Sequence, residues 1–273
     1  MPLQRRLDRL AWPEVRQAAR RHGSTVVWPW GSVEQHGPHL PLATDGLFAE
    51  RILDAALEGV AEDLPVWRLP LQAIGFSPEH LSFAGTLSLP PELLIQTVCS
   101  VGEQLAACGF ERLVLFNAHG GQIALLQTAA RELRVRAPGL GVLPCFLWSG
   151  IEGVAERLPE AERHGGLHAA LAETSLMLHL ESALVGAQRP RDGQLTPPPP
   201  AGWSLEGAAP TAWLMGDLST SGVVGDAGGA ETRLGGELSD ALVQGWRQRL
   251  ESLLVSDWPP GRVLPSTPSP ECG

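Results

Sequence analysis

The chain alternates between short apolar runs and longer segments with helical periodicity, and this alternation restricts the folds that it can adopt. Four runs rich in β-branched residues are predicted as strands: Ser24–Trp30, Pro65–Ala73, Arg112–Asn117 and Gly141–Trp148. Between them, apolar residues recur at helical spacing, as in Glu92–Ala107, where Pro90 and Pro91 precede the pattern and Gly109 follows it. Strands that alternate with helices form βαβ units. We therefore predict an α/β fold with a mainly parallel sheet that is covered by helices on both faces.

The remaining segments fit a single domain at residues 1–258. A second helix is predicted at Gln122–Arg136 and a last one at roughly Glu231–Leu254. The proline-rich segment Gln194–Pro210 is predicted to be an irregular loop and not a linker between domains. The tail at residues 259–273 is also rich in proline and is predicted to be disordered.

Composition excludes several classes of protein. The chain has 273 residues and a net charge of −10 without a basic cluster, so nucleic acid and anionic membranes are not expected as partners. No apolar run reaches the roughly 18 residues that a membrane span needs. The N-terminus lacks the apolar core of a signal peptide, so we expect a cytoplasmic protein. The chain has no lysine, which excludes a P-loop lysine and a Schiff-base lysine, and its four cysteines show no CxxC spacing.

The densest group of ionisable residues follows the first predicted strand. Glu34 and His36 are two positions apart, so in an extended segment their side chains point the same way. Asp45 follows at a turn that opens the next predicted helix, and His39 lies between them. Each residue alone could be an ordinary loop residue, but four such groups crowded at the end of a strand favour a site. Carboxylates and imidazoles together suit a divalent cation such as zinc, manganese or iron.

Two further elements carry candidate groups. His119 lies at the carboxyl end of the third predicted strand, where it can face the same crevice as Glu34 and His36, although a lone histidine there can also be structural. His168 and Glu173 flank the start of a later apolar helix. Residues five positions apart are not on one helical face, so both can reach the site only if His168 precedes the helix. The alternative is that Glu173 is a surface residue.

These elements together resemble the creatininase (creatinine amidohydrolase) family over roughly residues 8–255. The resemblance rests on an ordered set of segments: Glu34-Gln-His-Gly-Pro-His39 with Asp45, His80-Leu-Ser-Phe-Ala-Gly-Thr86, Asn117-Ala-His-Gly-Gly121, His168 with Glu173-Thr-Ser175, and Ser221-Gly-Val-Val-Gly-Asp226. It implies an α/β/α sandwich, a homo-oligomer that is usually a hexamer, and two divalent metal ions (zinc, manganese or iron) in each active site.

The resemblance also implies roles for the ligands. Glu34 and His119 would hold one metal ion, His36 the other, and Asp45 would bridge both. Creatininase supplies one more carboxylate two residues after the histidine that matches His119, where this chain has a glycine. Glu173 is then the expected replacement, either as a ligand or as a catalytic group.

The implied reaction is hydrolysis of a small-molecule C–N bond, in a cyclic amide or a formamide, by a metal-bound hydroxide. His168 is the candidate that transfers the proton to the leaving nitrogen, and its alternative role is to orient a ligand through a hydrogen bond. His80, His39 and Trp148 are predicted to line the substrate pocket. The exposed Trp203 and Trp213 are predicted to supply contacts between subunits.

Creatinine itself is not the expected substrate. Creatininase has a lid tryptophan where this chain has His164, and a tyrosine and a glutamate where it has Gly120 and Gly121. We therefore expect a larger pocket that has lost stacking surfaces, and a larger amide as substrate. The alternatives are trimming of a precursor peptide, as in the mycofactocin branch of the family, and a metal-binding scaffold without catalysis. A nucleotide-binding α/β protein ranks last, because no G-x-G-x-x-G follows the first strand.

Overall fold

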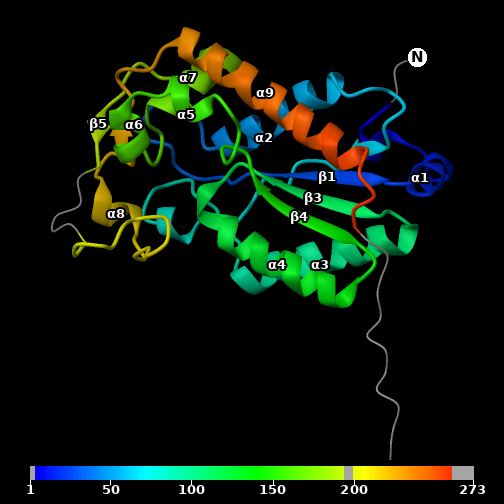
Figure 1. Ribbon diagram of the computed structural model, residues 1–273. Helices are drawn as coiled ribbons and strands as arrows, with labels where there is room; N and C mark the ends of the chain where they lie inside the picture. Colours follow the sequence, from blue (N-terminus) through cyan, green and yellow to red (C-terminus); the bar gives the residue numbers. More distant parts are fainter. Residues whose placement is uncertain (1–3, 194–198, 260–273) are drawn as a thin grey trace, which may run out of the picture.

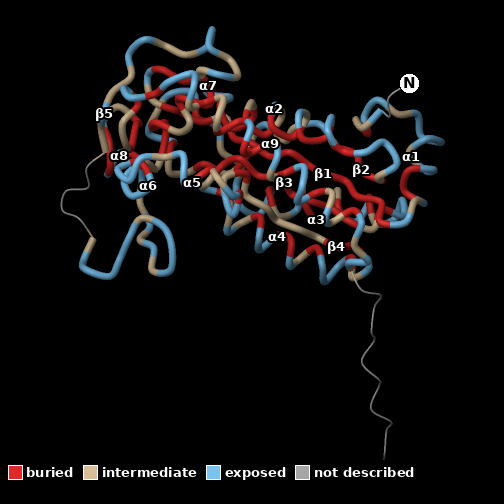
Figure 2. Tube along the Cα trace, turned by 45° about the horizontal axis from the view of Figure 1, so that its top comes forward, coloured by how far each residue is buried: buried red, intermediate tan, exposed pale blue. Residues whose placement is uncertain are grey.

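A four-stranded parallel sheet forms the centre of the protein. The computed structural model describes residues 4–193 and 199–259. The strands lie in the order β2–β1–β3–β4, and all neighbours are parallel. Their bounds are Thr25–Trp30 for β1, Val66–Arg68 for β2, Arg112–Asn117 for β3 and Gly141–Phe146 for β4. β1 and β3 are buried along their whole length (Figure 2), as a sheet covered on both faces requires.

The predicted strands differ from the structure mainly at β2. The sequence predicts Pro65–Ala73, whereas regular pairing ends at Arg68. Pro70 has no N–H to donate, and the chain pairs with β1 again only at Gln72, whose backbone N–H donates to the Pro29 carbonyl over 2.9 Å. The proline therefore divides one apolar run into a short strand and an isolated bridge.

Helices cover both faces of the sheet, which confirms the three-layer α/β/α sandwich (Figure 1). α3 (Pro91–Cys108) and α4 (Ile123–Arg136) cover one face, and α2 (Thr44–Glu58) and α9 (Thr232–Leu254) cover the other. Alternate residues of β1 enter the two cores: Val26 packs in the core with α3 and α4, and Val27 packs in the core with α2 and α9.

The helix bounds agree with the predicted ones to within one or two residues. α3 ends at Gly109, whose positive φ of 103° is the left-handed conformation that ends helices. α4 begins one residue later than predicted, because a 3₁₀ turn at Gly120–Gln122 precedes it. In the described ranges 4–193 and 199–259, no helix is long and apolar enough to cross a membrane.

The rest of the described chain forms shorter elements: α1 lies at one end of the sheet, and α5, α6, α8 and β5 lie at the other (Figure 1). A two-stranded antiparallel sheet joins β5 to β6. The described residues 199–210 contain no helix or strand, in agreement with the predicted loop, whereas residues 260–273 of the predicted disordered tail lie outside the described residues. The bounds of the short elements are α1 Trp12–Ala19, α5 Val154–Arg157, α6 Glu160–Gly165, α7 Leu171–Leu180, α8 Met215–Leu218, β5 Arg191–Asp192 and β6 Gly225–Asp226.

Candidate metal centre

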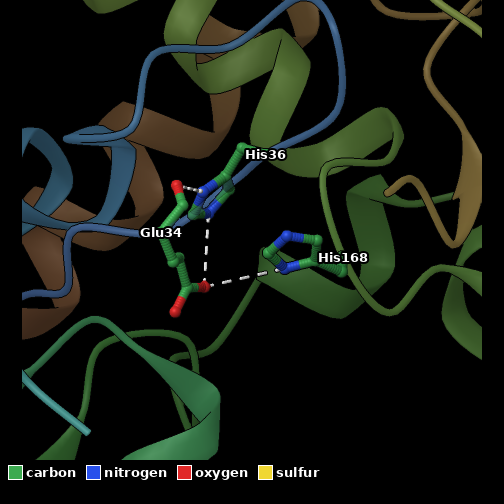
Figure 3. Close-up of side chains that lie close together, drawn as sticks. All are labelled: Glu34, His36 and His168. Atoms are coloured by element: carbon green, nitrogen blue, oxygen red, sulfur yellow. Dashed lines mark hydrogen bonds and ion pairs between the residues drawn. The ribbon is translucent and has the colours of Figure 1, made fainter. Parts of the chain in front are cut away.

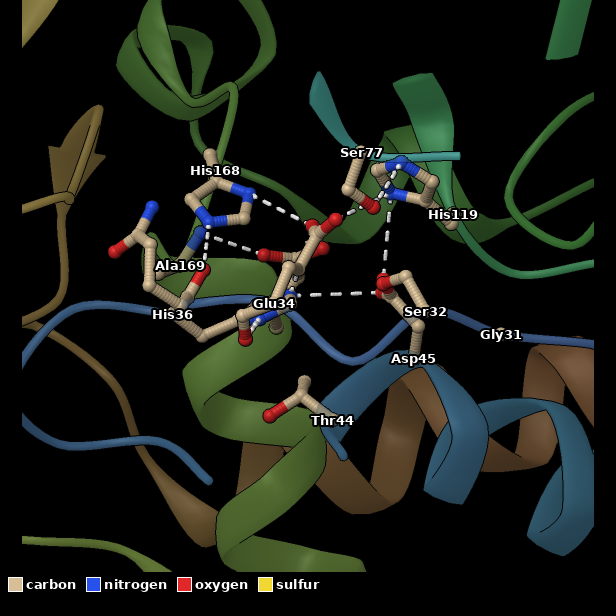
Figure 4. A network of polar contacts seen from close by, with 12 residues as sticks. Gly31, Ser32, Glu34, His36, Thr44, Asp45, Ser77, His119, His168 and Ala169 are labelled. Atoms are coloured by element: carbon tan, nitrogen blue, oxygen red, sulfur yellow. Dashed lines mark hydrogen bonds and ion pairs between the residues drawn. The ribbon is translucent and has the colours of Figure 1, made fainter. Parts of the chain in front are cut away.

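Five predicted ligands meet at the carboxyl ends of β1 and β3, and Figure 4 labels four of them, Glu34, His36, Asp45 and His119. Glu34 and His36 follow β1, and His119 follows β3. Asp45 lies in the first turn of α2, and Glu173 lies in the first turn of α7. The first four are buried, and Glu173 is partly exposed. The carboxyl ends of parallel strands are where open α/β sheets place their ligands, so the position of this cluster agrees with the fold.

One group of potential ligands consists of Glu34, Asp45 and His119, which offer atoms within 4.8 Å of one another. The Nδ1 atom of His119 lies 3.2 Å from Oε2 of Glu34 and 3.4 Å from Oδ2 of Asp45. The Nε2 side of the same ring lies 3.0 Å from the Phe76 carbonyl and 3.1 Å from Oγ of Ser77. An N–H at Nε2 can donate to these oxygens, and Nδ1 then presents its lone pair to the carboxylates.

A second group consists of His36, Asp45 and Glu173. The Nε2 atom of His36 lies 3.5 Å from Oδ1 of Asp45, and its Nδ1 lies 3.1 Å from the Glu34 carbonyl. The two carboxylate oxygens of Asp45 therefore face different histidines, Oδ1 towards His36 and Oδ2 towards His119. Asp45 can therefore offer one oxygen to each of the two groups.

Unpaired buried atoms indicate that the cluster fits metal ions. Oε2 of Glu34 and Nε2 of His36 are buried and make no hydrogen bond within the described part of the chain. Leaving buried polar atoms without partners costs about 1–3 kcal/mol each, and more for charged groups. Divalent cations that take carboxylate and imidazole ligands would satisfy these atoms.

The pKa values show how strongly the cluster is charged. Burial alone would raise the pKa of Glu34, but the positive charge of His119 lowers it, to about 2. Burial would lower the pKa of His36, but the charge of Asp45 raises it, to about 9. Burial raises the pKa of Glu173 to about 7. Without metal, protons on the histidines therefore supply the positive charge that the carboxylates require.

His168 lies just before α7, which is the condition under which it and Glu173 both reach the site. Its ring faces Glu34 and His36 (Figure 3), with a centroid distance of 4.3 Å to His36. Nε2 of His168 lies 2.8 Å from the Gln35 carbonyl, and Nδ1 lies 3.9 Å from Oε1 of Glu34. Burial and the neighbouring charge of His36 hold the pKa of His168 well below its usual value.

The turn after His168 fixes the Glu173 carboxylate. Ala169 adopts a positive φ of 51°, and its N–H donates to Oε2 of Glu173 over 2.6 Å. His168 itself pairs with Val224, whose N–H donates to the His168 carbonyl over 2.9 Å. The segment that contains Val224 thus holds the turn after His168 in place.

A cavity of about 220 Å³ adjoins the cluster. Of the residues predicted to bind substrate, His80 and Trp148 line it, together with His168. The structure does not place His39 among the lining residues: its Nε2 lies 2.8 Å from Oγ1 of Thr174, away from the cavity. A role of His39 in substrate binding stays a prediction.

The sequence analysis missed three glutamates that line the cavity, Glu79, Glu162 and Glu206. Glu79 is the most informative of them, because a Cβ atom added at Gly121 would lie 1.8 Å from its Oε1 atom. The carboxylate of Glu79 thus occupies the space beside Gly121, where creatininase has a glutamate. The sequence feature that could have identified Glu79 is its position directly before His80, which is predicted to line the pocket.

The expected loss of stacking surfaces is wrong. Phe146, Trp148 and Trp213 all line the cavity, so aromatic rings from other segments form its walls. Trp213 is only partly exposed, and its Nε1 atom donates to the Leu205 carbonyl over 3.3 Å, whereas Trp203 is exposed as expected. A role of either tryptophan in subunit contacts stays a prediction. His164 is exposed on α6, outside the cavity lining.

An α/β sandwich with a carboxylate and histidine cluster for divalent metal ions at its strand ends defines a class of metal-dependent hydrolases. The family model described as creatinine amidohydrolase matches residues 8–250. The chain therefore belongs to the creatininase family.

Individual relatives agree with this assignment. A mycofactocin precursor peptide peptidase of Mycobacterium tuberculosis (strain ATCC 25618 / H37Rv) is 36% identical over 244 residues, which cover 86% of each chain. The creatinine amidohydrolase of Pseudomonas putida is 30% identical over 66% of this chain and 73% of its own length. A solved structure described as creatininase with manganese has a TM-score of 0.73 at 24% identity, and it covers 93% of this chain and 100% of its own.

Proposed function

We propose that the protein hydrolyses an amide C–N bond with the help of two divalent metal ions. The observation that carries the proposal is the position of Asp45 between two ligand groups, with one carboxylate oxygen towards each histidine. In this proposal Glu34 and His119 would hold one ion, His36 and Glu173 would hold the other, and Asp45 would offer one oxygen to each. Zinc, manganese and iron all suit this donor set.

The bound ions would lower the pKa of water towards neutrality and polarise the amide carbonyl. The chain's own residues position the ligands: the Phe76 carbonyl and Oγ of Ser77 orient His119, and the Glu34 carbonyl orients His36. We assign the transfer of a proton to the leaving nitrogen to His168, because its ring lines the cavity beside Glu34.

The relatives favour a peptide amide as the substrate. The mycofactocin precursor peptide peptidase shares more sequence, over more of the chain, than the creatinine amidohydrolase does. Glu162 lines both the cavity and a cleft of about 1080 Å³, which a longer substrate would reach by passing this side chain. The second candidate is a non-peptide amide or formamide, which the small volume of the cavity itself favours.

Metal analysis together with a panel of amides tests the proposal. Protein purified without chelator is expected to contain about two divalent ions per chain, and Asp45→Ala is expected to lose most of them. The metal-loaded enzyme is then offered short peptide amides, a formamidopyrimidine and creatinine at equal metal content. Stoichiometric metal in Asp45→Ala would exclude the bridging role, and failure to hydrolyse any amide would exclude the proposed reaction. Creatinine as the best substrate would overturn the preference for peptides.

A further inference from the structure

The wall of the cavity carries more negative charge than metal binding requires. Besides the proposed ligands, the carboxylates of Glu79, Glu162 and Glu206 line it. None of the three forms an ion pair with an arginine within residues 4–193 and 199–259. No arginine in that part of the chain lines the cavity, and the chain has no lysine. Apart from the proposed metal ions and the histidines of the lining, a substrate carboxylate would therefore meet no cationic group here.

The three glutamates have different surroundings. Glu162 accepts a hydrogen bond from the Ala172 N–H at the start of α7 over 2.9 Å, and this bond already stabilises part of its negative charge. Oε1 of Glu79 lies 3.5 Å from Nε2 of His119. Glu206 has neither kind of partner within the described residues, and its side chain is exposed to solvent where it lines the cavity. Glu206 is thus the carboxylate available to a ligand.

A short loop carries Glu206, which lines the same cavity as the indole of Trp213. The Ser204 N–H donates to the Ala209 carbonyl over 3.1 Å, and the Thr211 N–H donates to the Ser204 carbonyl over 2.8 Å, which closes the loop. The bond from Nε1 of Trp213 to the Leu205 carbonyl holds the indole next to the residue that precedes Glu206. The centroid of the indole lies 6.4 Å from that of His80, and the two rings are nearly perpendicular, at 83°.

A carboxylate and an indole together are a typical receptor for an ammonium group, because both the charge and the π face attract cations. We propose, building on the proposed amide hydrolysis, that the site takes substrates with an ammonium group near the scissile amide and rejects those with a carboxylate there. Glu206 and Trp213 form the ammonium subsite. Specificity then comes from the 204–213 loop, whereas the metal cluster supplies the chemistry.

Binding of three matched probes to the metal-loaded protein tests the inference. Glycyl-phenylalaninamide carries one positive charge, N-acetylglycyl-phenylalaninamide is neutral, and malonyl-phenylalaninamide carries one negative charge at the position of the ammonium group. We expect Kd, measured by calorimetry, to rise in that order. Glu206→Gln is expected to reduce the preference for the cation over the neutral probe by about fivefold, and Trp213→Leu by a similar factor. Raising the salt concentration is expected to weaken the preference.

Glu103→Gln is the matched control, since it makes the same change at an exposed position on α3 and is expected to leave all three Kd values unchanged. Equal affinity for the three probes, no binding of the cation at millimolar concentration, or an unchanged preference in Glu206→Gln would each overturn the ammonium subsite. These outcomes are read from binding and not from turnover. Loss of the proposed hydrolysis would instead appear as an absence of product in the same samples.

Discussion

Gly121 is expected to be the position beside the metal centre that tolerates a side chain least. Its backbone passes so close to Glu79 that a Cβ atom would lie 1.8 Å from Oε1 of Glu79 and 2.7 Å from Nε2 of His119. Real Cβ atoms do not approach other atoms to within 3.0 Å. Gly121→Ala must therefore displace the Glu79 carboxylate, the imidazole of His119, or both.

The cost follows from the packing. Forcing one extra carbon into a filled space costs about 1–3 kcal/mol, which lowers the melting temperature of a chain of this size by about 2–10 °C. Because His119 is one of the two crowded groups, we also expect metal affinity to fall by about 10- to 100-fold, as when a group that orients a ligand is changed. Thermal denaturation of the metal-free protein measures the first effect, and competition with a chelator measures the second.

Gly120→Ala is the matched control, because a Cβ atom there meets nothing within 4 Å. The variant is expected to melt and to bind metal as the unmodified protein does. Adding Glu79→Ala to Gly121→Ala removes one of the two crowded groups, so the double variant is expected to recover part of the lost stability. Identical behaviour of Gly120→Ala and Gly121→Ala would refute the reasoning.

Two further predictions concern pH and assembly. In the metal-free protein the folded-state pKa of His36 is raised to about 9, and that of His119 is raised well above its usual value. The two protonated histidines therefore contribute fully to the stability of the folded protein below pH 6.5, and this contribution is lost as the pH rises towards 9. The melting temperature of metal-free protein is therefore expected to fall over this range, and a rise would contradict the charge assignment. The family resemblance predicts a homohexamer, six times the chain mass of 29.1 kDa, and light scattering that gives a monomer at micromolar concentration would contradict it.

The sequence predicts those parts of the molecule whose conformation is determined by residues that are close in the chain. β3 has the predicted bounds because its six residues are buried and flanked by a glycine turn and the active-site loop. Glu34, His36 and His119 could be grouped because each follows a parallel strand, and the carboxyl ends of such strands meet at one edge. The bounds of β2 could not be predicted, because the bridge at Gln72 depends on where Pro29 lies in space.

The walls of the cavity could not be predicted for the same reason. Glu206 and Trp213 reach the site only because the 204–213 loop closes on itself and packs over His80. No periodicity in a segment without helix or strand specifies such a fold. The position of Glu79 depends on Gly121, which is 42 residues away in the chain, and the contact becomes visible only when both backbones are in place.

The spread of the ligands along the chain has a consequence for folding. Asp45 and Glu173 face the same histidine but are 128 residues apart in the sequence. An ion held by both would link distant segments only in the folded chain, and because the unfolded chain does not keep the two ligands together, metal binding would stabilise the folded state by mass action. Metal occupancy would then slow global unfolding, and a chain that ends before α7 would lack the second of these ligands. The metal centre would then connect α2, which carries Asp45, to α7, which carries Glu173, in the folded protein.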